Sequence, residues 1–420
     1  MIDPDDQALL TQMFQAAVDA ADPSVALSGH IPDRPKGRTI VIGAGKGAAQ
    51  MAAAFEDLWG EPVEGIVVTR YGYGGPTRHL PVLEAAHPVP DDAGLAASAA
   101  LRAAVQGLTP DDLVVALICG GGSALLPSPP EGLSLADEQS LNKALLASGA
   151  PISAMNAIRK HVSTIKGGRL AAAAYPAPVV SLIVSDVPGD DPAQVASGPT
   201  VPDPLRQADA LRLVASYGIA LPDPVAKYLQ TAPDAPLPTD PIFANNNVKV
   251  VASAALSLDA AAAAARSKGI TPVILSDAIE GEARDVGLVH AAIARETRLR
   301  GRPFDTPVVI LSGGETTVTV RGDAGRGGRN TEFLLSFAQG IEGLRVTALA
   351  ADTDGIDGSE NNAGAFANGE TWSRLRQAGR DPGSDLAGHD AWTAFDTLDD
   401  LFVPGPTGTN VNDFRAILIR

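Results

Sequence analysis

A glycine-rich turn with one lysine follows an apolar run at residues 41–49, Val-Ile-Gly-Ala-Gly-Lys-Gly-Ala-Ala. Glycine lets a backbone approach a ligand closely, and the first amides of a following helix attract an anion. The lysine is therefore a candidate to bind a phosphate or carboxylate. The alternative is a plain strand–helix turn whose lysine faces solvent. The candidate contacts are Gly43, Gly45, Lys46 and Gly47.

Two nucleotide-binding patterns match this segment only in part. It is not a Walker A loop, because no Ser or Thr follows Lys46 and the first glycine of that loop is missing. It fits a loose dinucleotide fingerprint through Gly43, Gly45 and Ala48. Arg70 stands after the next apolar run, where the acidic residue that binds ribose is expected. This weakens NAD as a ligand and leaves NADP open.

A second glycine-rich turn, Cys119-Gly-Gly-Gly-Ser123, also follows an apolar run. Its free amides and the serine hydroxyl could form an anion-binding nest. A serine nucleophile is disfavoured, because the segment is not the G-x-S-x-G elbow and no His or Asp lies nearby. A simple turn is the alternative. The candidate contacts are Gly121, Gly122 and Ser123.

Residues 156–169 place polar side chains on one stripe of a predicted helix and apolar side chains on the other. Arg159 could bind a carboxylate or phosphate bidentately, and Lys160 could bind it as a point charge. The alternative is a solvated polar face. The candidate contacts are Asn156, Arg159 and Lys160.

Three carboxylates follow the apolar run that ends near residue 184, and a polar turn comes soon after them. Mg²⁺ is commonly held by one or two carboxylates together with substrate phosphates. A carboxylate could also accept the proton of an attacking hydroxyl. A loop without function is the alternative. The candidates are Asp186, Asp190 and Asp191, with Ser197 in the polar turn.

Residues 312–315 and 325–331 are two further glycine-rich segments, and the second of them contains two arginines. Arg326 and Arg329 are candidates to neutralise the charge on a transferred phosphoryl group. A hairpin loop with exposed arginines is the alternative. The candidates are Gly313, Gly314, Glu315, Arg326, Arg329 and Asn330.

Two further polar segments lie at 352–358 and 407–413. The first begins like an EF-hand loop, but Ala363 stands where the twelfth-position Glu is required, so calcium binding of that type is rejected. These segments could hold Mg²⁺ or ribose hydroxyls, or they could be plain turns. The six histidines lack metal-ligand spacing, so a zinc site is not expected. The candidates are Asp354, Asp357, Thr409 and Asn410.

Apolar runs rich in β-branched residues place these motifs at the ends of predicted strands. The runs alternate with helix-like Ala/Leu segments, which predicts an α/β fold with a parallel sheet covered on both faces. Ligands bind such sheets beyond the carboxyl ends of the strands, where the motifs fall. The runs span residues 38–47, 65–75, 112–123, 179–190, 271–279, 306–316 and 345–358.

The rest of the chain gives weaker predictions. Helical periodicity covers 5–28 and 281–301, and a helix capped by an Asn is predicted within 245–269. The Pro- and Asp-rich stretch 229–243 is a linker or a long surface loop. Alternation within 315–328 predicts an added strand pair in a smaller domain.

Composition limits the classes of function. The 420 residues are 45% hydrophobic and carry a formal net charge of -17, which makes nucleic acid and anionic membrane poor partners. Cys119 is the only cysteine, so no intramolecular disulfide forms. The acidic N-terminus is unlike a signal peptide, and the longest uncharged stretch is broken by Gly and Pro. A cytoplasmic enzyme is therefore expected.

Seven of these motifs, in this order, resemble the glycerate 2-kinase family whose C-terminal part is called MOFRL. They are VIGAGKGA, CGGGSALL, NAIRKHVSTIKGGRLA, SDVPGDDPAQVASGPTVPDP, SGGETTVTVRGDAGRGGRNTEF, ALAADTDGIDG and TGTNVNDF. The resemblance implies a Rossmann-like N-terminal domain, a smaller mixed-sheet α/β C-terminal domain and an active site in the cleft between them. The expected bounds are 5–238 and 239–420, with MOFRL at about 305–415.

The resemblance also implies ATP- and Mg²⁺-dependent phosphorylation of D-glycerate, typically to 2-phosphoglycerate. It implies catalytic roles for Lys46 and Arg329. Our own hypothesis from the residues places Mg²⁺ at Asp186, Asp190 or Asp191. A homodimer is left open. Family members also carry the label hydroxypyruvate reductase, so an NAD(P)H-dependent reductase is the main alternative. A noncatalytic metabolite-binding regulator is the second.

Overall fold

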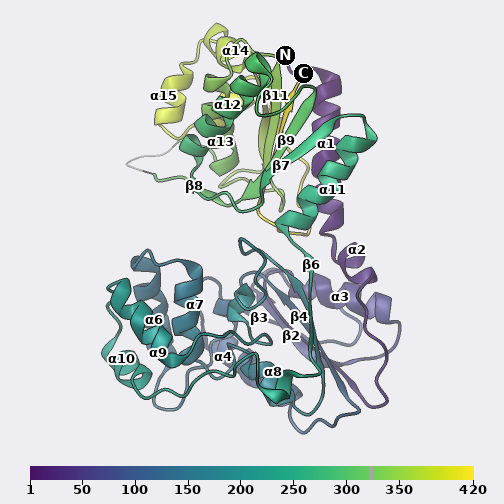
Figure 1. Cartoon of the computed structure of the whole chain (residues 1–420), viewed down its shortest axis with the longest axis vertical. Coiled ribbons are helices and arrows are strands. Elements are labelled where there is room, and N and C mark those ends of the chain that lie inside the picture. The colour runs from purple at the N-terminus through teal and green to yellow at the C-terminus, as the bar shows by residue number, and fades with distance from the viewer. Residues whose placement is uncertain (321–324) are drawn as a thin grey trace. The chain divides into compact units, whose positions relative to one another are not determined.

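The computed structural model of the protein describes residues 1–320 and 325–420, and the chain forms two compact units (Figure 1). The first unit is Pro23–Val251. The second unit combines Met1–Asp22 with Ala252–Arg420. Each unit has its own six-stranded sheet and its own core.

A parallel sheet forms the centre of the first unit, in the order β3-β2-β1-β4-β5-β6. The pairs from β3 to β5 are all parallel, so their carboxyl ends meet at one edge. The strands are β1 (Thr39–Ala44), β2 (Glu64–Arg70), β3 (Val82–Ala85), β4 (Leu113–Cys119), β5 (Val179–Val184) and β6 (Asn247–Ala252).

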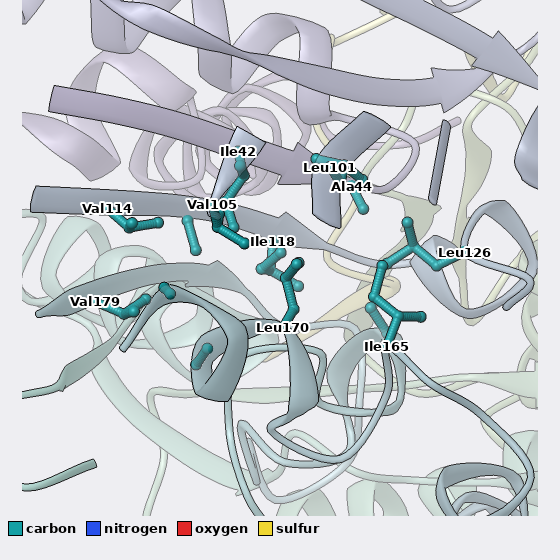
Figure 2. Close-up of a cluster of buried hydrophobic side chains, with 14 of the residues drawn as sticks. Ile42, Ala44, Leu101, Val105, Val114, Ile118, Leu126, Ile165, Leu170 and Val179 are labelled. Carbon is teal, nitrogen blue, oxygen red and sulfur yellow. The ribbon is translucent and has the colours of Figure 1, made fainter. Parts of the chain in front are cut away.

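Helices cover this sheet and bury its apolar side chains. Figure 2 shows Ile42 and Ile118 from neighbouring strands in one cluster with Leu101 and Leu170 from two helices. The helices are α2 (Pro23–Ser28), α3 (Ala48–Trp59), α4 (Asp92–Ala104), α5 (Gly122–Leu125), α6 (Leu135–Ala147), α7 (Ile152–His161), α8 (Arg169–Ala174), α9 (Gln207–Ser216) and α10 (Asp223–Leu229), with 3₁₀ turns η1 (Val195–Ser197) and η2 (Pro241–Phe243).

A mixed sheet forms the centre of the second unit, in the order β13-β12-β11-β14-β9-β7. Only the β7–β9 pair is parallel. The strands are β7 (Thr271–Ser276), β9 (Val308–Gly314), β11 (Val346–Asp352), β12 (Gly364–Asn368), β13 (Leu401–Phe402) and β14 (Asp413–Ile419), and β8 (Gly281–Glu282) pairs separately with β10 (Thr316–Thr317).

Alternating side chains divide the second unit's core between the two faces of the sheet. Val309 and Leu311 pack with α1 and α11 residues, whereas Val308 and Ile310 pack with α12 and α13 residues, as the two-residue period of a strand requires. The helices are α1 (Pro4–Ala20), α11 (Ala254–Ser267), α12 (Ala283–Arg300), α13 (Arg329–Gly340), α14 (Thr371–Gln377), α15 (Pro382–Ala387) and α16 (Ala391–Thr397).

The α/β fold with a parallel first sheet and a mixed second sheet, predicted from the sequence, is confirmed. The unit boundaries differ from the predicted 5–238 and 239–420. Leu10, Met13 and Phe14 of α1 pack on the second unit's sheet, so the first helix belongs there. Helicity over 5–28 is also interrupted at Asp22, which separates α1 from α2.

The predicted Asn-capped helix within 245–269 is wrong in its first third. Residues 247–252 form β6, because Val and Lys alternate there and the strand extends the sheet beside β5. Ser253 caps α11 instead, accepting a hydrogen bond from the Leu256 amide. Asn246 accepts a hydrogen bond from the Val179 amide at 2.9 Å.

Two other predictions also change. The stretch 229–243 is a loop within the first unit and not a linker, with its Phe243 side chain buried in the core. Within 315–328, only residues 316–317 form a strand, and its partner is parallel. Residues 321–324 of that segment lie outside the described part of the chain.

Among the described helices, none has the length and apolarity to cross a bilayer.

A buried histidine should make stability depend on pH. Burial lowers the pKa of His290 to about 4, while its ring contacts Val286 O and Ser312 Oγ at 2.8 and 3.0 Å. Between pH 4 and 6.5 the unfolded chain therefore binds this proton and the folded chain does not, so stability rises with pH by roughly 3 kcal/mol in total. Urea unfolding across this range measures the pH dependence, and His290→Gln should reduce the rise relative to the wild type by roughly 3 kcal/mol. The exposed His30→Gln variant should keep the wild-type slope, and an unchanged slope in His290→Gln would contradict the assignment.

Candidate active site

Two glycine-rich turns pack on each other at the carboxyl edge of the first unit's sheet. The Lys46 amide donates to Gly120 O at 2.8 Å, and the Gly47 amide donates to Cys119 Sγ at 3.2 Å. Gly45 has φ of 139°, and a Cβ there would collide with the carbonyl of Cys119. Glycine at this position is therefore required for the two turns to meet.

The Lys46 side chain lies along the second turn. A Cβ built on Gly121, whose φ is 80°, would lie 2.9 Å from Lys46 Cγ. The same point is 3.2 Å from both Lys46 Cε and His87 Nε2. The Thr69 hydroxyl donates to Lys46 O at 2.9 Å, which fixes the backbone from the β2 side. The lysine is thus held over the turn, with its side chain half-buried.

The single cysteine has a structural role. Cys119 is 4% exposed, and burial raises the pKa of its thiol to about 12. A thiolate is the reactive form of cysteine, so this group is inert at neutral pH. Its sulfur accepts the Gly47 amide and thereby joins the two turns.

A chain of hydrogen-bonded polar side chains contacts the second turn through Ser123. Ser123 Oγ lies 2.7 Å from Ser197 Oγ, and Ser197 Oγ donates to Asn156 Oδ1 at 2.9 Å. Arg159 Nη1 donates to the same Asn156 oxygen at 3.0 Å. Ala196 and Ser197 have φ of 53° and 59°, a strained conformation that proteins retain mainly at functional sites. The structure thus joins four predicted residues from three distant segments.

Lys160 does not belong to this group. It forms a salt bridge with Asp203, and both side chains are buried. Burial lowers the pKa of Lys160, while the Asp203 carboxylate raises it. An ammonium group with a buried carboxylate partner is not available to a ligand. The polar side chains of α7 therefore do not form a solvated face. Lys160 pairs with Asp203 inside the protein, whereas Asn156 and Arg159 support the second turn.

The three predicted metal-binding carboxylates have different surroundings. Asp186 lies against Gly120, where a Cβ would collide with its carboxylate. Asp191 Oδ1 accepts the Ala193 amide at 3.0 Å, which is a turn contact, and Asp190 has φ of 54°. Within residues 1–320 and 325–420, no three His, Cys, Asp or Glu side chains could hold a metal ion by themselves. Carboxylate oxygens suit Mg²⁺ shared with phosphate oxygens, so Asp186 and Asp190 fit that arrangement and not a protein cage.

A second cluster of charged residues, centred on Arg329, lies in the second unit. Asp352 ends β11 and pairs in register with Asp413, which begins β14. Arg329 begins α13, and its Nε donates to Asp413 Oδ1 while Nη2 donates to Asp352 Oδ2, both at 2.6 Å. Its Nη1 lies 3.7 Å from Glu315, and the side chain is 26% exposed. Two of its nitrogens are thus fixed by aspartates, and the third lies near the exposed Glu315.

Asp413 is the hub of this cluster. Its Oδ2 accepts from Arg415 Nη2 at 2.5 Å and from the amide and hydroxyl of Thr316, both at 3.2 Å. Its Oδ1 accepts from Asn330 Nδ2 at 2.9 Å in addition to Arg329. Arg415 is fully buried. One carboxylate therefore serves two guanidinium groups, which leaves the trio with a net positive charge.

Burial also changes the acids of the cluster. It raises the pKa of Asp352 well above its usual value, although Arg329 lowers it. Burial likewise opposes the charge on Arg329, but Asp413 and Asp352 raise the pKa of that guanidinium. Arg329 is thus held in its charged form between two buried carboxylates, with its third nitrogen 3.7 Å from Glu315.

Asp357 holds the start of α13. Its Oδ1 accepts the Asn330 amide, and its Oδ2 accepts the amide and hydroxyl of Thr331, all at 2.9 Å. Burial raises its pKa to about 6 in spite of these hydrogen bonds. Asn330 Oδ1 is buried with no hydrogen-bond partner within the described ranges. Asp357 and Asn330 thus position the helix that carries Arg329.

The other predicted contacts have mainly structural partners. Arg326 stacks on Trp392, with its Cζ atom 3.5 Å from the ring centroid. Its guanidinium also pairs with Glu360 at 2.5 Å, so Arg326 does not share the aspartate partners of Arg329. Asp354 accepts the Ile356 amide, Thr409 donates to Ala21 O, and Asn410 accepts the Asn412 amide. Gly43 and Gly122 allow close packing on Val67 and Ala196. Gly313 O accepts from Arg415, and Gly314 pairs with Asp413.

Comparisons with known proteins show the family of this chain. A family model described as "Domain of unknown function (DUF4147)" matches residues 9–230, and the MOFRL family model matches residues 308–413. The D-glycerate 2-kinase of Thermotoga maritima is 38% identical over 423 residues, covering 100% of both chains. The crystal structure of a glycerate kinase from the same organism has a TM-score of 0.90 at 35% identity, with 100% of both chains covered. This chain belongs to the glycerate kinase family.

Relatives within the glycerate kinase family carry two kinds of name. A protein of Agrobacterium vitis named "Putative hydroxypyruvate reductase" is 52% identical over 414 residues, covering 98% of this chain and 94% of the relative. The kinase names belong to relatives that are less similar to this chain than that protein is. Family membership is therefore plain, and the reaction has to be argued from the residues.

Four residues of this glycerate kinase family member were not among the sequence candidates: His87, Asp352, Asp413 and Arg415. Asp352 and Asp413 each lie at an end of a motif that had been singled out, so position at a strand terminus was the available sign. Their pairing depends on the β11–β14 register, which local sequence does not encode. His87 follows β3, a short strand that no motif marks.

Proposed function

We propose that this protein transfers the γ-phosphoryl group of ATP to the 2-hydroxyl of D-glycerate, giving 2-phosphoglycerate and ADP. The named kinases of the family support the reaction and its two substrates. The proposal is for a cytoplasmic enzyme.

The observation that carries the proposal is the closed packing of the two glycine-rich turns. A dinucleotide fold presents the first amides of the helix after β1 to a pyrophosphate. Here the amides of Lys46 and Gly47, which lead into α3, bond Gly120 O and Cys119 Sγ, and the Ala48 amide at the start of α3 bonds Gly45 O at 3.2 Å, so these three amides are used within the protein. Gly45 likewise gives room to Cys119 rather than to a ligand. What the turn offers is the Lys46 side chain, which suits a kinase better than a dinucleotide-dependent reductase.

We also propose roles for individual residues on the basis of their chemistry. The Lys46 ammonium binds an anionic oxygen of a substrate, and Arg329 stabilises the charge on the transferred phosphoryl group through Nη1. The 2-hydroxyl oxygen forms a bond to the γ-phosphorus as the bond to ADP breaks. The hydroxyl proton passes to a carboxylate, for which Asp186 and Asp190 are the candidates.

Mg²⁺ belongs to this proposal as well. Asp186, Asp190 or Asp191 would hold it together with ATP phosphates, whichever of them does not accept the hydroxyl proton, and the bound ion would neutralise phosphate charge.

Hydroxypyruvate reduction is the second candidate, supported by the name of the 52% identical relative and by Arg70 at the end of β2. Two assays on the purified protein separate the candidates. The kinase requires ADP formation that depends on D-glycerate, and the reductase requires NADPH or NADH oxidation that depends on hydroxypyruvate. Nicotinamide oxidation without ADP formation would overturn the proposal, and neither activity would favour a noncatalytic regulator.

A further inference from the structure

Three half-buried basic side chains gather where the first three strands of the first unit end. Lys46 follows β1, Arg70 ends β2 and His87 follows β3. The β1–β2 and β2–β3 pairs are parallel, and Arg70 pairs in register with Ala85, two residues before His87. Parallel pairing therefore brings the three side chains to one edge of the sheet.

His87 faces Lys46 across the second glycine-rich turn. Its Nε2 and Lys46 Cε both lie 3.2 Å from the position of a Cβ on Gly121. A side chain at residue 121 would fill the space between them, so the glycine keeps that space open. The Arg70 guanidinium stacks on the ring of Tyr73, with Cζ 4.1 Å from the ring centroid.

The loop that carries His87 is anchored, and the imidazole ring has hydrogen-bonding capacity that no described residue uses. Asp91 anchors its loop by accepting from the Ala86 amide at 3.2 Å and from the Tyr71 hydroxyl at 2.8 Å. Burial, Lys46 and Arg70 lower the pKa of His87 to about 4, and no hydrogen bond within the described residues contributes to that shift. The imidazole is therefore neutral at pH 7 and offers one N–H donor and one acceptor.

We propose that Lys46, Arg70 and His87 form the subsite that binds the carboxylate of the three-carbon acid substrate, with His87 as a neutral N–H donor to it. This inference rests on the proposed function for the identity of the acid and deepens it by assigning the site's chemistry. Two cations supply the charge, and a half-buried donor with no partner among residues 1–320 and 325–420 gains one from the ligand.

The same subsite would accept hydroxypyruvate, because that acid has the same carboxylate. It would not bind glycerol, which has the hydroxyls but no charge. Binding to the subsite can therefore be measured separately from either reaction.

Isothermal titration of the full chain with D-glycerate, hydroxypyruvate and glycerol tests the inference, with and without a non-hydrolysable ATP analogue. We expect the wild-type protein to bind both acids and not glycerol. His87→Ala should weaken binding of both acids by about tenfold or more and leave the affinity for the ATP analogue unchanged. His87→Gln, which keeps an N–H donor, should recover part of the loss, and Arg70→Met should weaken binding as His87→Ala does.

The exposed His79→Ala variant is the matched control and should bind as the wild type does. Wild-type affinity for D-glycerate in His87→Ala, or no acid binding by the wild-type protein under either condition, would overturn the subsite. Circular dichroism separates a folding defect in His87→Ala, and His87→Gln then carries the test. If the wild-type protein binds D-glycerate but forms no ADP with it, the proposed function fails while the subsite stands.

Discussion

Replacing Lys46 with Met should lower kcat/KM for D-glycerate in ADP formation by about a hundredfold or more and leave the protein folded. Met keeps most of the length and the apolar stem of lysine and removes only the ammonium group. The backbone contacts of residue 46, to Gly120 O and from Thr69 Oγ1, do not involve the side chain and should persist. The loss should therefore appear in kcat/KM and not in thermal stability.

Steady-state kinetics together with a thermal melt checks this expectation. Lys143→Met is the matched control, because Lys143 is an exposed lysine on α6 in the same unit. Its kinetics should equal those of the wild type. A kcat/KM of Lys46→Met within a few-fold of the wild type would remove Lys46 from the catalytic machinery.

Replacing Arg329 with Ala is the second change with a large expected effect. Turnover should again fall by about a hundredfold or more, because the guanidinium that stabilises phosphoryl charge is lost. The fold should survive, since Asp413 keeps Arg415, Thr316 and Asn330 as donors. Stability should decrease by a few kcal/mol, because the buried Asp352 loses its cation.

Arg329→Lys separates charge from geometry. It keeps a cation but cannot reach both aspartates with a planar fork, so it should recover only part of the turnover. Arg376→Ala is the control, because Arg376 pairs with the exposed Glu342 at 2.6 Å in the same unit and has no assigned role. Kinetics of Arg329→Ala equal to those of the Arg376 control would show that the cluster is purely structural.

The sequence predicts the architecture because strand and helix periodicity are local properties. Each of the runs 38–47, 112–123 and 179–190 contains a strand of the first sheet, with its glycines or acids at the carboxyl end. Unit boundaries were less accessible, since α1 joins a sheet whose first strand comes more than two hundred and forty residues later. The apolar face of α1 shows that it is buried, but not against which sheet.

The candidate sites show the same division. Lys46 and Arg329 are candidates because each is a cation in a glycine-rich turn, and their catalytic roles stay predictions. Lys160 was misplaced, because its buried partner Asp203 lies forty-three residues away and no local pattern connects them. Asp413 was not predicted as a site residue for the same reason. Its contacts depend on strand register, which only the assembled sheet establishes.

The most direct test of the central claim is ³¹P NMR of the product formed from ATP and D-glycerate. Transfer to the 2-hydroxyl predicts a new phosphomonoester resonance split into a doublet by the single proton on C2, growing in step with ADP. A triplet would instead place the phosphate on the CH₂ oxygen and correct the position. No phosphomonoester resonance, with nicotinamide oxidised in the presence of hydroxypyruvate, would contradict the kinase account altogether.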